Sequence, residues 1–198
     1  GAELVSVGER AGVEVFIRKG IREIELAAVG QIDAPPAEVE AVLLDYESHP
    51  SFIDKLATSR VLDRKPGEMV VYERLALPVI HDRDYTLVVS WDPNQSRGLS
   101  FQIDNQRGVA PQPGVVRMTL MIGSWELAPV DGGRATRVLY RVRLDFSGSV
   151  PRWMVRSGAG MASAICTTVL STSASAFSTG RKADPSCTMK ARMPAQVF

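Results

Sequence analysis

Two long runs of alternating apolar and polar residues, joined by a short glycine-rich turn, constrain the fold of this chain more than any other feature of its sequence. In the second run, residues 136–146, every second residue from Val138 to Phe146 is apolar, and most of the residues between them are charged. The first run, residues 115–128, ends shortly before Asp131-Gly132-Gly133, a sequence typical of a hairpin turn. Because side chains alternate between the two faces of a strand, this hairpin predicts a sheet with one dry and one wet face.

Shorter β-type segments precede the hairpin, separated by turn sequences such as Lys65-Pro66-Gly67. We expect them to form strands at residues 13–18, 21–32, 58–64, 68–75, 84–92 and 98–105. Asp33, two prolines and apolar residues at helical spacing predict a helix over residues 36–47, capped by Asp33. Helices grouped beside an antiparallel sheet indicate the α+β class.

Pro151 begins the last regular segment, which we expect to be a long helix with Met154, Met161 and Ile165 along one side. Residues 1–180 then form one domain, and residues 181–198 form a tail. From Ser149 onward there are six basic residues and one acid, a net charge of +5, whereas the preceding part has 17 basic and 21 acidic residues, a net charge of −4. Such asymmetry is typical either of a surface that meets anionic lipid or nucleic acid, or of a solvated tail.

The chain lacks the short motifs that would identify a common enzyme or cofactor site. It contains no GxSxG, HExxH, P-loop or GxGxxG sequence. Its two cysteines, Cys166 and Cys187, do not have the spacing of metal ligands, and we expect both to be free thiols, with a single bridge between them as the alternative. We therefore expect no metal and no cofactor.

The two histidines, His49 and His81, are too few for a typical metal site built on histidine. We expect both to lie in loops or at the surface. The alternative for His81 is catalytic: paired with Asp82, Asp84 or Tyr85, it would form an acid–base group.

The length of apolar runs and the distribution of charge indicate whether the chain binds a membrane or a nucleic acid. No run reaches the roughly 18–20 apolar residues that span a bilayer. No leader is recognisable, so we expect a cytoplasmic protein, with a leader or anchor removed before Gly1 as the alternative. We also expect the protein to be a monomer. Trp153, between Arg152 and Arg156, suits either transient membrane contact or ordinary packing under the last helix. The absence of a basic helix argues against nucleic-acid binding.

Three segments carry a resemblance to a known family: residues 12–18 (GVEVFIR), 30–39 (GQIDAPPAEV) and 82–85 (DRDY). Together they resemble the opening strand, the strand-to-helix junction and the central motif of the START (StAR-related lipid transfer) family, within the Bet v 1-like or SRPBCC superfamily. The resemblance covers roughly residues 10–175. It implies the helix-grip fold, a curved antiparallel sheet wrapped around a long C-terminal helix with an internal apolar cavity. It also implies a lid, which here matches residues 107–114.

Arg83 is the most informative charged residue, because it shares a strand face with apolar neighbours such as Leu87 and Val89. A charge on an apolar face is costly unless it is paired. One hypothesis is that Arg83 binds the polar head of a lipid, with Glu73 as its partner by resemblance. The other is a salt bridge at the rim of the sheet, to Asp82, Asp84 or Glu73.

The remaining candidate ligand-binding residues are large apolar or aromatic side chains of the strands and of the last helix. They are Tyr72, Tyr85, Phe101, Met118, Leu120, Ile122, Trp125, Tyr140, Val142, Met161 and Ile165. Ordinary core packing is the alternative for each, but one helix does not fill the concave face of a strongly curved sheet, and the remaining volume makes a pocket.

These observations predict a protein that binds a sterol, phospholipid or other lipid in its cavity and carries, transfers or senses it. Two alternatives stay open: an aromatase/cyclase-type enzyme acting on a polyketide-like molecule, and a regulatory module whose partner protein recognises closure of the lid.

Overall fold

The computed structural model describes residues 5–10, 13–19, 23–53, 55–78 and 80–147. Its strands are β1 (Val5–Arg10), β2 (Val13–Lys19), β3 (Ile24–Ile32), β4 (Leu56–Lys65), β5 (Glu68–Leu75), β6 (Arg83–Trp91), β7 (Gly98–Ile103), β8 (Val116–Arg117), β9 (Leu120–Val130) and β10 (Ala135–Asp145). Helix α1 (Pro36–Leu44) and the 3₁₀ helix η1 (Tyr46–Ser51) connect β3 to β4. Two further 3₁₀ turns, η2 (Asn105–Arg107) and η3 (Asp131–Gly133), follow β7 and β9.

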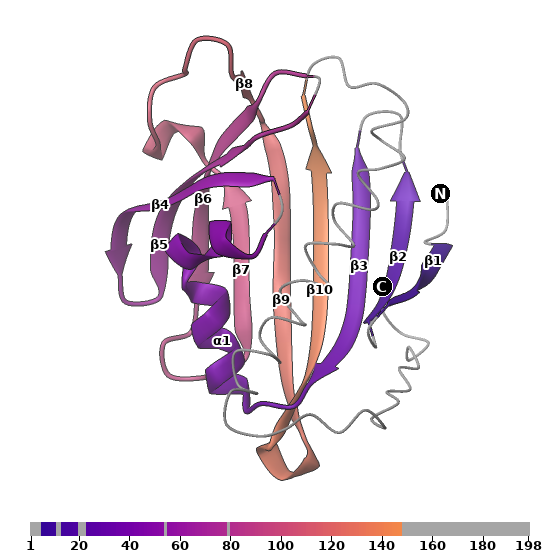
Figure 1. Ribbon diagram of the computed structural model, residues 1–198. Helices are drawn as coiled ribbons and strands as arrows, with labels where there is room; N and C mark the ends of the chain where they lie inside the picture. Colours follow the sequence, from indigo (N-terminus) through magenta and orange to yellow (C-terminus); the bar gives the residue numbers. More distant parts are fainter. Residues whose placement is uncertain (1–4, 11–12, 20–22, 54, 79, 148–198) are drawn as a thin grey trace.

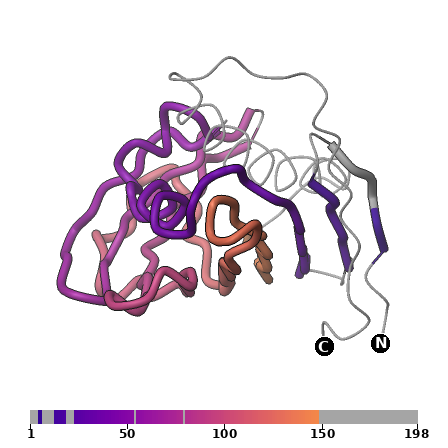
Figure 2. Tube along the Cα trace, turned by 90° about the horizontal axis from the view of Figure 1, so that it is seen from below, coloured from indigo at the N-terminus to yellow at the C-terminus, as the bar shows by residue number. Residues whose placement is uncertain are grey.

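The strands form one sheet in the order β1-β2-β3-β10-β9-β7-β6-β5-β4, and β8 pairs with β6 off this path. All neighbours along the path are antiparallel, whereas β8 runs parallel to β6. The order brings β10, late in the chain, between β3 and β9 (Figure 1). Seen from below, the chain follows an arc (Figure 2), and α1 packs on β7, β9 and β10.

The expected α+β class and the curved antiparallel sheet of the helix-grip fold are confirmed. Strand β5 has the expected bounds, and Asp131-Gly132-Gly133 joins β9 to β10 as a hairpin. The expected strand at 115–128 is instead two strands, β8 and β9. The interruption follows from a backbone bond of Met118 N to Asp84 O, which ties the chain to β6 before β9 begins.

The start and end of the first helix differ from expectation. Pro35, not Asp33, precedes the helix, and no side chain caps it, although Pro36 does occupy its first turn as expected. The helix ends at Leu44 instead of residue 47, and the chain continues as η1, which contains Pro50. Strand β1, whose sequence VSVGER includes a glycine, was not expected.

Several expectations concern residues outside the described ranges. These are the C-terminal helix with Met161 and Ile165, the candidate membrane contact at Arg152, Trp153 and Arg156, the two cysteines and the tail. In the described ranges, no helix combines the length and the apolar character needed to cross a bilayer.

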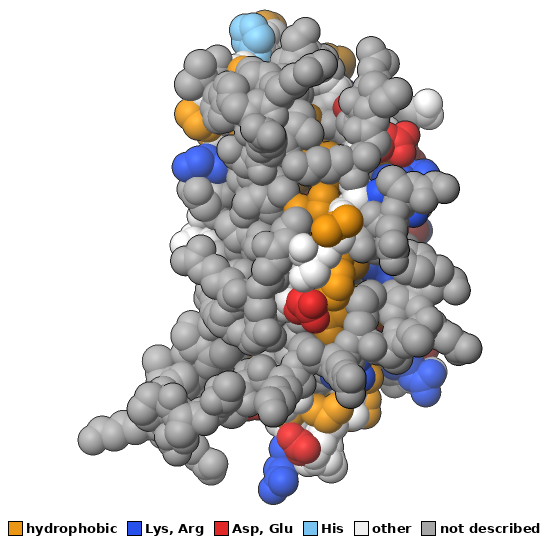
Figure 3. Space-filling model, turned by 90° about the vertical axis from the view of Figure 1, so that its right-hand side faces the viewer, with side chains coloured by type: hydrophobic (Ala, Val, Ile, Leu, Met, Phe, Trp, Pro, Cys, Tyr) orange, Lys and Arg blue, Asp and Glu red, His pale blue; other side chains and the backbone are white. Residues whose placement is uncertain are grey.

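The register of β10 sorts its side chains onto the two faces as the alternation predicts. Val138, Tyr140, Val142 and Leu144 are buried, whereas Arg137 and Arg143 are exposed. Tyr140 lies directly opposite Trp125 of β9 and Ala28 of β3, so the buried face continues across neighbouring strands. At the side of the molecule where β1 lies, hydrophobic side chains form a band with charged side chains at its flank (Figure 3).

The outer face of β5 and β6 is covered by a polar cluster and by the loop after η2. Asp84, 1% exposed, accepts two hydrogen bonds from Arg117, of 2.7 and 2.9 Å, and one of 3.2 Å from Tyr72. Arg117 also donates to the backbone oxygens of Val109 and Ala110. Gly108 lies so close to β6 that a Cβ there would come within 1.8 Å of Thr86 Oγ1. Residues 107–110 are therefore attached to the face opposite Tyr85 and Leu87, which contradicts the expected lid.

Asp84→Asn is expected to lower the free energy of unfolding by roughly 3 kcal/mol, because it leaves a largely buried guanidinium without its carboxylate. Urea denaturation measures this change. Glu126→Gln is the matched control, since Glu126 is half exposed and only 3.5 Å from Arg141, a pair worth less than about 1 kcal/mol. Equal losses in the two variants would contradict the assigned role of Asp84.

Candidate functional site: a cavity on the concave face

A cavity of about 110 Å³ lies on the concave face of the sheet. The described residues around it come from α1, η1 and the segment after it, from β4–β7, β9 and β10, and from the residue after β10. They are Leu43, Tyr46, His49, Ile53, Leu56, Glu73, Leu75, Leu87, Phe101, Met121, Trp125, Tyr140, Leu144 and Phe146. Most are apolar or aromatic, so the wall suits a ligand with a large apolar surface.

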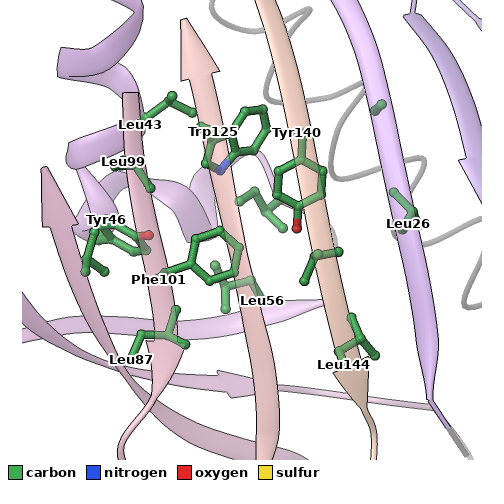
Figure 4. Packing of buried hydrophobic residues seen from close by; sticks show 14 of the residues in the cluster. Leu26, Leu43, Tyr46, Leu56, Leu87, Leu99, Phe101, Trp125, Tyr140 and Leu144 are labelled. Atoms are coloured by element: carbon green, nitrogen blue, oxygen red, sulfur yellow. The ribbon is translucent and has the colours of Figure 1, made fainter. Parts of the chain in front are cut away.

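Three aromatic side chains on neighbouring strands form one wall of the cavity (Figure 4). The rings of Trp125 and Tyr140 have centroids 4.3 Å apart, and those of Phe101 and Tyr140 are 6.3 Å apart. Gly123 lies opposite Phe101 in the ladder, and a Cβ at this position would come within 2.5 Å of the Phe101 ring. The glycine therefore leaves the space in which the Phe101 ring lies.

The segment from Tyr46 to Phe52 forms the opposite part of the wall. The His49 ring lies between Tyr46 and Phe52, with centroid distances of 4.7 and 5.4 Å. Its Nε2 is 3.2 Å from Val42 O, and burial lowers the pKa of His49, which favours a neutral ring. His49 is 6% exposed, so the expectation of a loop or surface position is wrong for it. His81 is exposed, as expected.

Glu73 is the one acidic residue among the described residues that line the cavity. It stands directly between Ser59 of β4 and Tyr85 of β6 in the ladder. Ser59 Oγ donates to Glu73 Oε1 at 3.2 Å, and the Tyr85 hydroxyl is also hydrogen-bonded to the carboxylate. Burial raises the pKa of Glu73 to about 7, because an apolar environment disfavours the charged form more than these two hydrogen bonds favour it.

Arg83 lies at the start of β6 with its side chain almost fully buried, and its guanidinium donates to backbone oxygens. Nε donates to Phe146 O at 3.0 Å, and the terminal nitrogens donate to His81 O and Ser147 O. Arg83 thus fastens the chain after β10 to β6, an arrangement that neither hypothesis described. Its role toward a lipid head group stays a prediction.

The expected salt bridges of Arg83 are replaced by other pairs. Asp82 pairs with Arg74 at 2.6 Å, and Asp84 pairs with Arg117. The three acid–base partners considered for His81 are each bound to another residue: Asp82 to Arg74, Asp84 to Arg117 and Tyr85 to Glu73, while His81 is exposed.

The structure brings four of the expected ligand-binding residues to the cavity wall: Glu73, Phe101, Trp125 and Tyr140. Tyr85 lies beside Glu73 on the next strand, β6, and is not among the lining residues. Met118 and Val142 are buried in the core and are not among the lining residues.

The expectation that the cavity wall includes Leu120, Ile122 and Tyr72 is wrong. Leu120 and Ile122 pair with Asp145 and Arg143, so they lie on the outer face, and Ile122 is 43% exposed. Tyr72 also faces outward, where it contacts Asp84 and Arg60. Residues an odd number of positions apart on one strand cannot share a face, so Trp125 at the wall excludes Ile122.

Sequence reasoning did not assign the residues that α1 and η1 contribute. Tyr46, His49 and Phe52 recur every third residue, which is the period of a 3₁₀ helix and places their side chains on one side. Met121 was missed because its neighbour Ile122 was placed inward. No group of three His, Cys, Asp or Glu residues in the described part of the chain is arranged to hold a metal ion.

Comparisons with known proteins identify a matching family and similar folds. The model of the family described as polyketide cyclase/dehydrase and lipid transport matches residues 32–163. An uncharacterized protein of Pseudomonas aeruginosa is 24% identical over 150 residues, which is 74% of each chain.

Two solved structures are similar in fold. A STAR-related lipid transfer protein of Xanthomonas axonopodis superposes with a TM-score of 0.73 and 18% identity, covering 86% of this chain and 98% of that one. An aromatase/cyclase from a Streptomyces species has a TM-score of 0.62 and 14% identity, covering 81% and 99%. At this identity the likeness establishes the fold, which is the one that the START resemblance implied.

Glu73 makes the stability of the protein depend on pH. Its pKa is raised from about 4.5 to about 7 on folding, so the unfolded chain releases the proton first. The free energy of unfolding is therefore expected to fall by about 3 kcal/mol as pH rises from about 4.5 to about 7. Glu73→Gln should lack this pH dependence of the free energy of unfolding and should be more stable than the parent protein above pH 7. Urea denaturation at pH 5 and pH 8 measures it, and parallel profiles for the two proteins would contradict the assignment.

Proposed function

Since the chain belongs to the polyketide cyclase/dehydrase and lipid transport family, we propose that it binds a lipid-like ligand in its cavity and carries, transfers or senses it without chemical change. The observation that carries this proposal is the cavity wall, which is mostly apolar or aromatic: Phe101, Trp125 and Tyr140 line it together with Leu43 of α1 and Ile53 after η1. The lipid transfer protein with the same fold supports it.

Burial of apolar ligand surface supplies the free energy of binding. Each 100 Å² of apolar ligand surface removed from water stabilises the complex by about 2.5 kcal/mol. The cavity of about 110 Å³ is smaller than the roughly 300–1,000 Å³ typical of sites for drug-sized ligands. Uptake of a whole lipid therefore requires the cavity to widen, and a Met side chain such as that of Met121 adapts to such changes in shape.

The alternative is an aromatase/cyclase, and the specific observation in its favour is a buried carboxyl group that faces the cavity. A cyclisation by general acid–base catalysis removes a proton from one ligand atom and supplies a proton to another, so it needs a second acid–base group within reach of the ligand. His49 lines the cavity, but its Nε2 lies 3.2 Å from Val42 O and its ring packs between the rings of Tyr46 and Phe52. This arrangement favours binding over catalysis.

Native mass spectrometry of the purified chain, followed by organic extraction and identification of the extract, tests the proposal. A stoichiometric lipid that is recovered unchanged supports a binding protein. Absence of lipid, with no uptake from mixed liposomes, contradicts it. Turnover of a polyketide-like compound would establish the cyclase instead.

Two adjacent residues of β9 provide a matched pair of variants. Met121 lines the cavity and Ile122 lies on the outer face. We expect Met121→Trp to fill the cavity and reduce lipid uptake from liposomes at least about tenfold, the equivalent of about 1.4 kcal/mol. Ile122→Trp should leave uptake unchanged. Circular dichroism confirms that both variants are folded, and equal uptake by the two would exclude this cavity as the binding site.

A further inference from the structure

Among the described residues that line the cavity there is one carboxyl group, that of Glu73, and no lysine or arginine. Glu73 is 5% exposed, and the other polar lining residues are Tyr46, His49, Trp125 and Tyr140. A protein interior rarely retains a carboxyl group in an apolar wall unless that group has a partner.

The contacts of the Glu73 carboxyl leave part of its hydrogen-bonding capacity unused. It accepts one hydrogen bond from Ser59 and one from Tyr85. A carboxylate has about four acceptor sites, and a protonated carboxyl is in addition a donor. A ligand whose polar end reaches Glu73 therefore finds both an acceptor and, in the protonated form, a donor.

Among the described residues, the groups around Glu73 do not supply a compensating positive charge. The neighbours that influence it from η1 and β6 are the neutral hydroxyls of Tyr46 and Tyr85, and His49 is held in its neutral form by burial. Tyr140 faces the same space from β10. Arg83, two residues before Tyr85 on β6, donates to three backbone oxygens.

We propose that Glu73, in its uncharged form, is the group that binds the polar end of the ligand, and that the cavity therefore selects apolar molecules ending in a neutral hydroxyl group over those ending in an anion. This inference rests on the proposed function and specifies its ligand class. It goes further in making binding depend on the protonation of one side chain.

The physical reason is the cost of like charges in an apolar environment. An anionic head group beside Glu73 would either repel the carboxylate or require a second proton in the same site. A hydroxyl donates to the carboxyl oxygen and accepts from the carboxyl proton, so both polar groups are satisfied without a net charge. An ammonium group would also pair with a carboxylate, but only if Glu73 were ionised in the complex.

Ligand binding should then be linked to proton uptake. An apolar ligand removes the remaining water from the carboxyl, which favours the protonated form further. Since the free protein has a Glu73 pKa of about 7, affinity for a neutral ligand should be constant below that pH and decrease above it, by up to about tenfold per pH unit.

Three soluble probes with the same ten-carbon chain test the selectivity: 1-decanol, decanoate and decylamine. Their dissociation constants are measured by isothermal titration calorimetry with the full chain at pH 6 and pH 8, where decanoate is ionised and decylamine protonated. In the parent protein at pH 8, we expect decanol to bind at least about tenfold more tightly than decanoate. We also expect its affinity to be up to about tenfold higher at pH 6 than at pH 8.

Two variants isolate the role of Glu73. Glu73→Gln should bind decanol equally at the two pH values and should narrow the ratio of decanol to decanoate affinity. Tyr85→Phe removes a donor to the carboxylate, so it should move the decline in decanol affinity to higher pH. Glu126→Gln, on the outer face, should behave as the parent. Circular dichroism establishes folding of each variant.

Several outcomes would overturn the inference. Decanoate bound as tightly as decanol at pH 8, or a pH dependence that survives in Glu73→Gln, excludes selection through this carboxyl. Decylamine bound most tightly at pH 8, with the preference lost in Glu73→Gln, would establish a cationic ligand class instead. Binding of all three probes with equal affinity refutes only the inference, whereas absence of binding by any probe, with no extractable lipid, refutes the proposed function as well.

Discussion

The pairing of β10 with β3 on one side and β9 on the other holds the two halves of the sheet together. Strands β1–β3 reach the rest of the sheet only through β10 along the strand order. The register of these ladders also sets Trp125 opposite Tyr140, and Tyr140 opposite Ala28. A slip by one residue would exchange the two faces of a strand and move its aromatic side chains from the cavity to the solvent. The cavity wall is thus a consequence of strand register.

The acidic residues of the β5–β6 ladder have different partners because they lie on different faces of the sheet. Asp84 and Tyr85 are adjacent in sequence, but Asp84 faces the outer cluster, where Arg117 pairs with it through two hydrogen bonds. Glu73, the inward partner of Tyr85, accepts hydrogen bonds from neutral hydroxyls only. Burial among hydroxyls and apolar groups raises the pKa of Glu73, whereas Asp84 has a guanidinium partner within hydrogen-bond distance. The alternation of the strand therefore separates an acid that stabilises the fold from one available to a ligand.

The sheet could be predicted from the sequence because its information is local. Alternation in residues 136–146 and the Asp131-Gly132-Gly133 turn were enough for the β9–β10 hairpin. Two of the three partners of Arg83 are backbone oxygens 63 and 64 residues away, and they could not be predicted because a backbone oxygen has no signature in residue type. Ile122 was misplaced for a different reason: its hydrophobicity was given more weight than its odd separation from Trp125. Residue type identifies candidates for a cavity, and parity decides which of them face it.

Binding of a lipid requires the cavity to widen. The part of the wall outside the sheet has fewer backbone hydrogen bonds to resist this widening than the paired strands have. Ile53 and Leu56 belong both to the cavity and to an open groove between the η1 segment and residues 76–78, so these two side chains separate the cavity from the groove. The η1 segment is held by turn-type backbone bonds, by the contact of His49 with Val42 O and by ring packing, whereas β9 is paired along its length. Segments with fewer backbone restraints open at lower free energy than paired strands. The η1 segment, and not residues 107–110 on the outer face, is therefore a part of the described wall that has few backbone restraints.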